Sequence, residues 1–209
     1  MTSPFGTVYN PISLHRQLTD AWEAKSFDSS EIVQHNGLWK NLQTHSSFAS
    51  PQQDELERVT LQLHASVREG LHRGRWLFIT YGTAWVYDHR SSGQIVANCH
   101  KLPGNGFSKR LLSPEEIIKS FDRLHQIAQE RNPKLQMMLT LSPVRHVRDS
   151  LALNQLSKSV LRYSLHQIIE KPPEVIPELS LESKTQWCRK GIDIHPESCK
   201  PFPSFHGQR

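Results

Sequence analysis

The stretch that decides the fold is Trp76-Leu77-Phe78-Ile79-Thr80-Tyr81-Gly82-Thr83, a short apolar run that ends at a glycine. Runs of this kind are typical of a parallel strand that is covered on both faces. A second run, Leu135 to Leu141, ends at Ser142-Pro143. Two strands with a crossover helix between them favour a right-handed parallel unit. The sequence therefore predicts an α/β protein with a three-layer, mostly parallel sheet flanked by helices.

Helical segments precede and separate these strands. Ser50-Pro51-Gln52-Gln53 has the residues of a helix start with Ser50 as its cap, and Gly74 is placed to end that helix. Ser113-Pro114-Glu115-Glu116 is a capping box, and Asn132-Pro133 stops the helix that follows it. Apolar residues recur every three or four positions and predict a buried face on each helix: Leu56, Val59, Leu63, Val67 and Leu71, then Ile117, Phe121, Leu124 and Ala128.

Composition favours a single soluble domain. The 209 residues are 36% hydrophobic, which is enough for a core without disulfide or metal support. No apolar run approaches the roughly 20 residues that cross a bilayer, the N-terminus has no signal-peptide pattern, and three scattered cysteines fit a reducing compartment. We therefore expect a cytoplasmic protein with no membrane partner.

The net charge of +5 could indicate attraction to nucleic acid. The basic residues are dispersed, however, and no aromatic-basic motif of a nucleic-acid module is present, so no nucleic-acid partner is predicted. The last part of the chain, 172–209, is expected to be an irregular tail, because six prolines interrupt it and apolar residues thin out.

Four short segments occur in an informative order. They are Pro4-Phe5-Gly6-Thr7-Val8-Tyr9-Asn10-Pro11, Gly82-Thr83-Ala84-Trp85-Val86-Tyr87, Ala97-Asn98-Cys99-His100-Lys101-Leu102-Pro103, and Ser142-Pro143-Val144-Arg145-His146 with Asp149, Asn154, Ser157 and Lys158 downstream. Together they resemble the GSCFA family over about residues 4 to 171, so residues 1–171 are interpreted as a partial domain of that family.

The resemblance implies an incomplete SGNH fold, which is flavodoxin-like, and a relation to the SGNH/GDSL ester hydrolases. In these enzymes a serine attacks the ester, a later Asp-x-x-His supplies the base and its orienting carboxylate, and backbone N–H groups stabilise the oxyanion. A small-molecule or glycan ester is the implied substrate, and no cofactor is implied.

The resemblance also implies that catalytic parts are missing from this chain. The family serine lies in a Gly-Ser-Cys-Phe-Ala motif upstream of the Phe-Gly-x-x-Tyr-Asn-Pro segment, which here begins at Pro4. Ser3 cannot replace that serine because no strand precedes it. The family's terminal Asp-x-x-His-Pro has its nearest match in Asp193-Ile194-His195-Pro196, whose spacing is one residue short. Because short motifs arise by chance, we favour coincidence over a relocated catalytic pair, and we expect truncation at the N-terminus and divergence or truncation at the C-terminus.

Two groups of residues after the first strand are substrate-binding candidates, each with a simpler alternative. The N–H of Gly82, with Thr83 beside it, could face an oxyanion, or Gly82 could serve only a tight turn. Asn98 and His100 could supply an amide and an imidazole to the cleft, or could stabilise their loop by local bonds. Cys99 between them is interpreted as a packed thiol, since no base is evident that would lower its pKa.

The second strand end supplies the catalytic candidates. Arg145 could bind an anionic or acyl group, and His146 could act as a base oriented by Asp149. Alternatively, Asp149 caps the helix that carries Ser157. No metal site is predicted, because the paired short spacings of zinc sites are missing among Cys188, His195, Cys199 and His206.

The leading hypothesis is a partial SGNH-type serine ester hydrolase or acyl transferase scaffold that lacks its nucleophile and is inactive alone. The alternatives are a noncatalytic protein that binds an acylated or anionic ligand in the same cleft, and the product of a broken gene.

Overall fold

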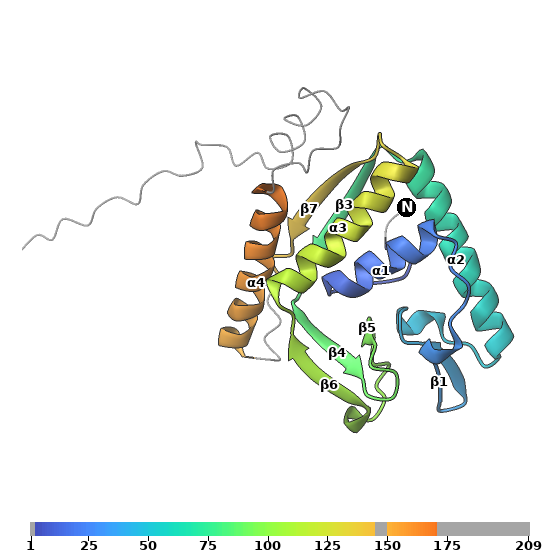
Figure 1. The fold of residues 1–209 in the computed structure, drawn as a ribbon. Coiled ribbons are helices and arrows are strands. Elements are labelled where there is room, and N and C mark those ends of the chain that lie inside the picture. The colour runs from blue at the N-terminus through green and yellow to red at the C-terminus, as the bar shows by residue number, and fades with distance from the viewer. Residues whose placement is uncertain (1–2, 145–149, 171–209) are drawn as a thin grey trace, which may run out of the picture. The chain divides into compact units, whose positions relative to one another are not determined.

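The computed structural model of the chain describes residues 3–144 and 150–170, which belong to one compact unit, Met1–Glu170 (Figure 1). Its helices are α1 (Pro11–Trp22), α2 (Gln53–Arg73), α3 (Pro114–Arg131) and α4 (Leu151–Glu170). Its strands are β1 (Ile32–His35), β2 (Leu38–Asn41), β3 (Trp76–Tyr81), β4 (Trp85–His89), β5 (Ile95–Val96), β6 (Phe107–Leu111) and β7 (Gln136–Leu141). None of the described helices is both long enough and apolar enough to span a membrane.

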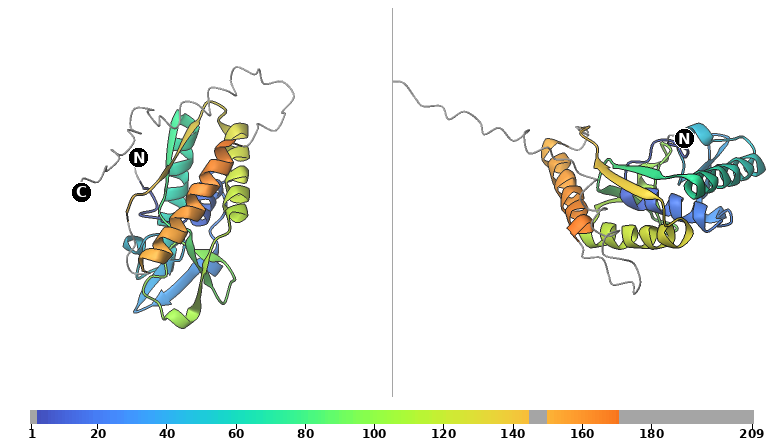
Figure 2. Two further views of the ribbon diagram at one scale, coloured as in Figure 1. Left: turned by 90° about the vertical axis from the view of Figure 1, so that its left-hand side faces the viewer. Right: turned by 90° about the horizontal axis from the view of Figure 1, so that it is seen from above.

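The two predicted strands pair with each other. β3 and β7 are parallel and in register from Trp76 opposite Gln136 to Tyr81 opposite Leu141. α3 comes between them in the chain, and Figure 2 shows α1 and α3 on the same side of the pair. The prediction of an α/β fold with parallel strands is confirmed; its three-layer arrangement stays a prediction.

The core lies between this strand pair and the helices. Ile79 and Tyr81 of β3 pack in one apolar cluster with residues from all four helices, namely Leu18, Ala21 and Trp22 of α1, Val67 and Leu71 of α2, Ile117, Leu124 and Ala128 of α3, and Leu161 of α4. Because side chains alternate along a strand, the odd-numbered residues of β3 supply its buried face.

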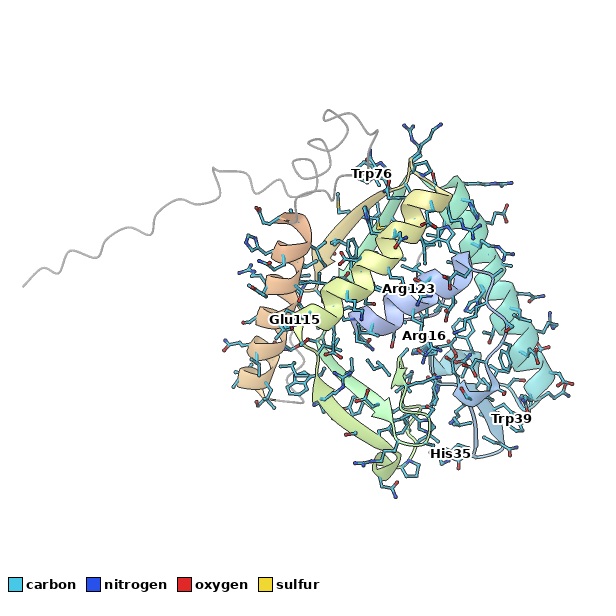
Figure 3. All side chains as sticks on the ribbon, viewed as in Figure 1. Arg16, His35, Trp39, Trp76, Glu115 and Arg123 are labelled. Carbon is cyan, nitrogen blue, oxygen red and sulfur yellow. The ribbon has the colours of Figure 1, made fainter. Side chains whose placement is uncertain are left out.

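The other face of β3 is exposed. Trp76, at the start of the strand in Figure 3, is 49% exposed and Phe78 is 64% exposed. The prediction that this strand is covered on both faces is wrong for the described residues. The two aromatic rings contact each other, with centroids 6.4 Å apart, and present an apolar surface that soluble monomers rarely leave bare.

The excursion between β3 and α3 is an antiparallel sheet. Its strand order is β5-β4-β6, and β4 pairs with β6 from Trp85 opposite Leu111 to His89 opposite Phe107. A separate hairpin joins β1 and β2 through Asn36 and Gly37, which both have positive φ. An Asn-Gly pair is a strong hairpin signal for this reason.

The predicted helix boundaries are partly confirmed. The capping box of α3 is present in both directions between Ser113 and Glu116, and Gly74 is the C-cap of α2. Ser50 does not cap α2, which begins at Gln53. The backbone of Ser50 instead exchanges two hydrogen bonds with Trp39 of β2. Ser50 is therefore part of a β-bridge and not of the helix start that the local pattern predicts.

Candidate functional site

The carboxyl ends of β3 and β7 lie side by side. Tyr81 and Leu141 are opposite each other in the register, and the N–H of Ser142 donates to the Tyr81 carbonyl oxygen at 2.9 Å. Gly82 and Ser142 therefore begin the two loops at the same edge of the sheet. Ligands of open parallel sheets bind at this edge.

Gly82 and Thr83 are held by the first family-like segment. Their two N–H groups donate to one acceptor, the carbonyl oxygen of Tyr9, at 2.8 and 3.0 Å. A Cβ atom on Gly82 would lie 3.1 Å from that oxygen and from Cδ1 of the Tyr9 ring. A larger residue at position 82 would therefore have to displace Tyr9 by a few tenths of an ångström. The N–H groups of Gly82 and Thr83 point at Tyr9 in this structure.

The segment around Tyr9 is itself anchored. Asn10 caps α1 by accepting from the Ser13 N–H at 2.8 Å. One turn further along α1, His15 Nε2 lies 2.6 Å from the hydroxyl of Tyr81, and its Nδ1 lies 3.0 Å from Ser120 Oγ. Burial lowers the pKa of His15 to about 3, so the imidazole is neutral and connects β3 to α1 and α3 without charge.

Ser157 of α4 satisfies the next part of the β3 loop. Its hydroxyl accepts from the Ala84 N–H at 2.8 Å and lies 3.0 Å from the hydroxyl of Thr83. The Thr83 hydroxyl in turn accepts from the Trp85 N–H at 3.1 Å. Every backbone N–H from Gly82 to Trp85 therefore has a partner.

Lys158 brings a positive charge to the two strand ends. Its ammonium group donates to the carbonyl oxygens of Gly82 and Ser142 at 2.6 and 2.7 Å. Burial lowers the pKa of Lys158. In the sequence this lysine stands out only through the family resemblance, because bonds from a side chain to distant backbone carbonyls leave no local pattern.

Asn98 and His100 are held by other partners. The side-chain oxygen Oδ1 of Asn98 accepts from the His100 N–H at 2.8 Å, and His100 Nε2 lies 2.7 Å from the backbone carbonyl oxygen of Asn41. His100 is buried with a φ of 50°, and burial is the main cause that lowers its pKa. The first contact is a local loop bond, as in the simpler alternative, whereas the second joins the loop to the distant end of β2. A role of either residue in the cleft stays a prediction.

The remaining candidates have different outcomes. Arg145, His146 and Asp149 lie outside the described residues, as do Asp193 and His195. Cys99 packs beside Leu42, Val96 and Phe107, and burial raises the pKa of its thiol to about 11. A thiol with so high a pKa is a poor nucleophile, which supports its interpretation as a packed residue. The described residues contain no group of three side chains that could hold a metal ion.

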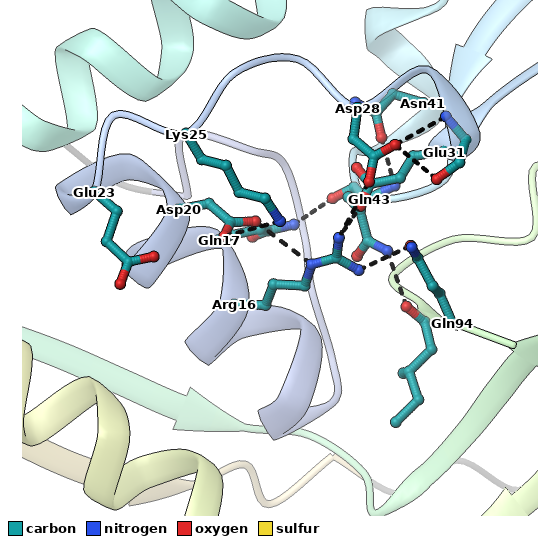
Figure 4. Close-up of polar contacts among 12 residues, drawn as sticks. Arg16, Gln17, Asp20, Glu23, Lys25, Asp28, Glu31, Asn41, Gln43 and Gln94 are labelled. Atoms are coloured by element: carbon teal, nitrogen blue, oxygen red, sulfur yellow. Dashed lines mark hydrogen bonds and ion pairs between the residues drawn. The ribbon is translucent and has the colours of Figure 1, made fainter. Parts of the chain in front are cut away.

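A second polar cluster surrounds Arg16 on α1 (Figure 4). The guanidinium contacts the carboxyl group of Glu31, and it also lies 3.4 Å from Asp20 and 3.1 Å from the Gln94 side-chain oxygen. Burial raises the pKa of Glu31 to about 7, although Arg16 opposes this shift. The cluster joins α1 to the segment before β1 and to the start of β5.

Arg123 of α3, labelled in Figure 3, forms a separate and weaker ion pair with Glu23, which follows α1, at 3.3 Å. Both side chains are more than a third exposed, and exposed ion pairs contribute little to stability.

Comparison with known proteins gives one match. A sequence model described as the GSCFA family matches residues 1–176. No curated protein and no solved structure matches the chain.

Proposed function

The chain belongs to the GSCFA family, and on this basis we propose that it forms the scaffold of an SGNH-type serine ester hydrolase or acyl transferase. The observation that carries the proposal is that three of the four family-like segments meet at one place. Hydrogen bonds join these segments at the ends of β3 and β7. The first segment contributes Tyr9, the second contributes Gly82 and Thr83, and the last contributes Ser142, Ser157 and Lys158.

The nucleophile in this proposal comes from a strand beside β3. β3 is bonded to β7 on one side, and within residues 3–144 and 150–170 no strand pairs with its other edge. A parallel strand at that edge, carrying Gly-Ser-Cys-Phe-Ala at its carboxyl end, would bring the serine level with Gly82. The lack of a described strand at this edge of β3 is consistent with such an addition.

The 209 residues do not contain that motif, so this polypeptide should have little or no esterase activity alone. Without a nucleophile, a triad enzyme retains only the contributions of its oxyanion site and of substrate binding. Hydrolysis of p-nitrophenyl butyrate tests the proposal. The chain is compared with a version that carries an N-terminal Gly-Ser-Cys-Phe-Ala strand and a C-terminal Asp-x-x-His-Pro segment.

The matched control is the same extended protein with the motif serine replaced by alanine. Activity in the extended protein, and its loss in the alanine control, is the expected result. If the extended protein folds and hydrolyses neither this ester nor longer acyl or glycan esters, the hydrolase proposal is wrong. The alternative of a noncatalytic protein that binds an acylated or anionic ligand then takes its place.

A further inference from the structure

The backbone at the end of β3 has no donor left for a ligand. Gly82 and Thr83 donate to Tyr9, Ala84 donates to Ser157, and Trp85 donates to Thr83. An oxyanion site made from backbone N–H groups needs donors that point at the ligand. Here an oxyanion could bind to Gly82 and Thr83 only after the Tyr9 carbonyl moved away, which would break both of these hydrogen bonds.

The ammonium group of Lys158 is placed differently. An ammonium has three N–H donors, and the carbonyl oxygens of Gly82 and Ser142 occupy two of them. Within the described part of the chain no carboxylate pairs with Lys158, and burial alone lowers its pKa. The charge is thus held between two strand ends by neutral partners, and none of the described residues is seen to accept from its third donor.

We propose that the ammonium group of Lys158, and not the backbone N–H groups of residues 82–85, binds the negatively charged oxygen of a ligand at this edge of the sheet. The ligand class is an oxyanion, either the carboxylate of a free carboxylic acid or a phosphate. The inference rests on the proposed position of the cleft, but it does not depend on catalysis, so it can be tested on the 209-residue chain as it stands.

The test is an NMR titration of the folded chain with sodium butyrate and, separately, with inorganic phosphate at matched ionic strength. Shifts of the Gly82 and Ser142 amide signals report binding. Loss of one charge-assisted hydrogen bond should weaken binding roughly tenfold or more in Lys158→Gln. Lys119→Gln on the exposed side of α3 makes the same charge change away from the strand ends and should bind as the wild type does. The two ligands distinguish a carboxylate from a phosphate site.

A second measurement does not depend on the variant folding. Acetic anhydride labels lysine side chains, and mass spectrometry then measures whether butyrate or phosphate protects Lys158 more than Lys119. Selective protection supports the inference. Equal protection of the two lysines by the anions, unchanged affinity in a folded Lys158→Gln, or no binding of either anion by the wild type would overturn it, whatever the outcome of the esterase assay.

Discussion

Replacing Glu31 with glutamine tests whether burial or the contact with Arg16 has the larger effect on the pKa of the Glu31 carboxyl group. Burial raises the pKa of Glu31 from 4.5 to about 7, against the opposing effect of Arg16. One pKa unit corresponds to about 1.36 kcal/mol, so ionising Glu31 costs up to ~3 kcal/mol more in the folded protein than in the unfolded chain. Glutamine keeps the shape of the side chain and removes its titration, while Arg16 retains Asp20 and Asp28 as partners.

The sign follows from proton binding. Between pH 4.5 and about 7 the folded chain binds more protons at Glu31 than the unfolded chain does, so the free energy of unfolding falls as the pH rises through this window. The stabilising contribution of the protonated form is complete below the unfolded pKa and is lost above the folded pKa. Burial lowers the pKa values of four histidines, which gives the opposite dependence: His15, His64, His100 and His125.

Urea unfolding followed by far-UV circular dichroism measures the effect at several pH values and constant salt. Subtracting the Glu31→Gln curve from that of the wild type cancels the histidines. We expect the stability of the wild type relative to the variant to fall by about 2–3 kcal/mol from about pH 5 to about pH 8. Glu69→Gln loses only an exposed ion pair with Arg73 and should show no such trend. A difference that stays constant or rises with pH would refute the reasoning, because the ion pair would then outweigh burial.

Three further substitutions test the fold and the strand ends. Gly82→Ala places a methyl group 3.1 Å from the Tyr9 oxygen and should lower the free energy of unfolding by about 1–3 kcal/mol, measured by urea denaturation; an unchanged value would show that Tyr9 can move freely. Asn132→Ala removes an amide that donates to three carbonyl oxygens around the end of α2 and should cost about 1–3 kcal/mol, against no measurable loss for the exposed Asn105→Ala. Phe78→Ser removes a ring that is 64% exposed. It should reduce self-association in sedimentation velocity and change the free energy of unfolding by no more than about 0.5 kcal/mol. Unchanged association would mean that this face of β3 does not mediate contacts between copies of the chain.

The sequence predicted those elements that depend only on residues close to each other in the chain. The four apolar residues of the α3 stripe, from Ile117 to Ala128, are all buried, and β3 and β7 occupy the predicted runs. Two further signals in the sequence mark other elements. Asn10-Pro11 starts α1 in the way that Ser113-Pro114 starts α3, and Asn36-Gly37 marks the turn of the β1-β2 hairpin.

What could not be predicted depends on partners far apart in the chain. The local pattern predicts Ser50 as a helix cap, but in the structure its backbone pairs with that of Trp39. β3 reads as a buried strand because Trp76 and Phe78 are apolar, and periodicity cannot reveal that no described element covers them. The bonds that Lys158 makes are likewise invisible in the sequence, since backbone carbonyl oxygens are the same at every position.

The buried face of α4 shows how the strand ends and the helix depend on each other. Three of the four buried residues on this helix are polar: Asn154, Ser157 and Ser164, beside Leu161. A face of this kind buries less apolar area than a leucine stripe would, so its stabilising effect must come from elsewhere. Ser157 accepts from the buried Ala84 N–H, and Lys158 on the following position donates to Gly82 and Ser142. Each buried backbone group left without a partner would cost about 1–3 kcal/mol. The polar residues of α4 therefore help Gly82 and Ala84 to be buried at the edge of the sheet, because Ser157 accepts from the Ala84 N–H and Lys158 donates to the Gly82 carbonyl oxygen. A leucine at position 157 would leave the Ala84 N–H without this acceptor and would destabilise the loop even though it would add apolar surface.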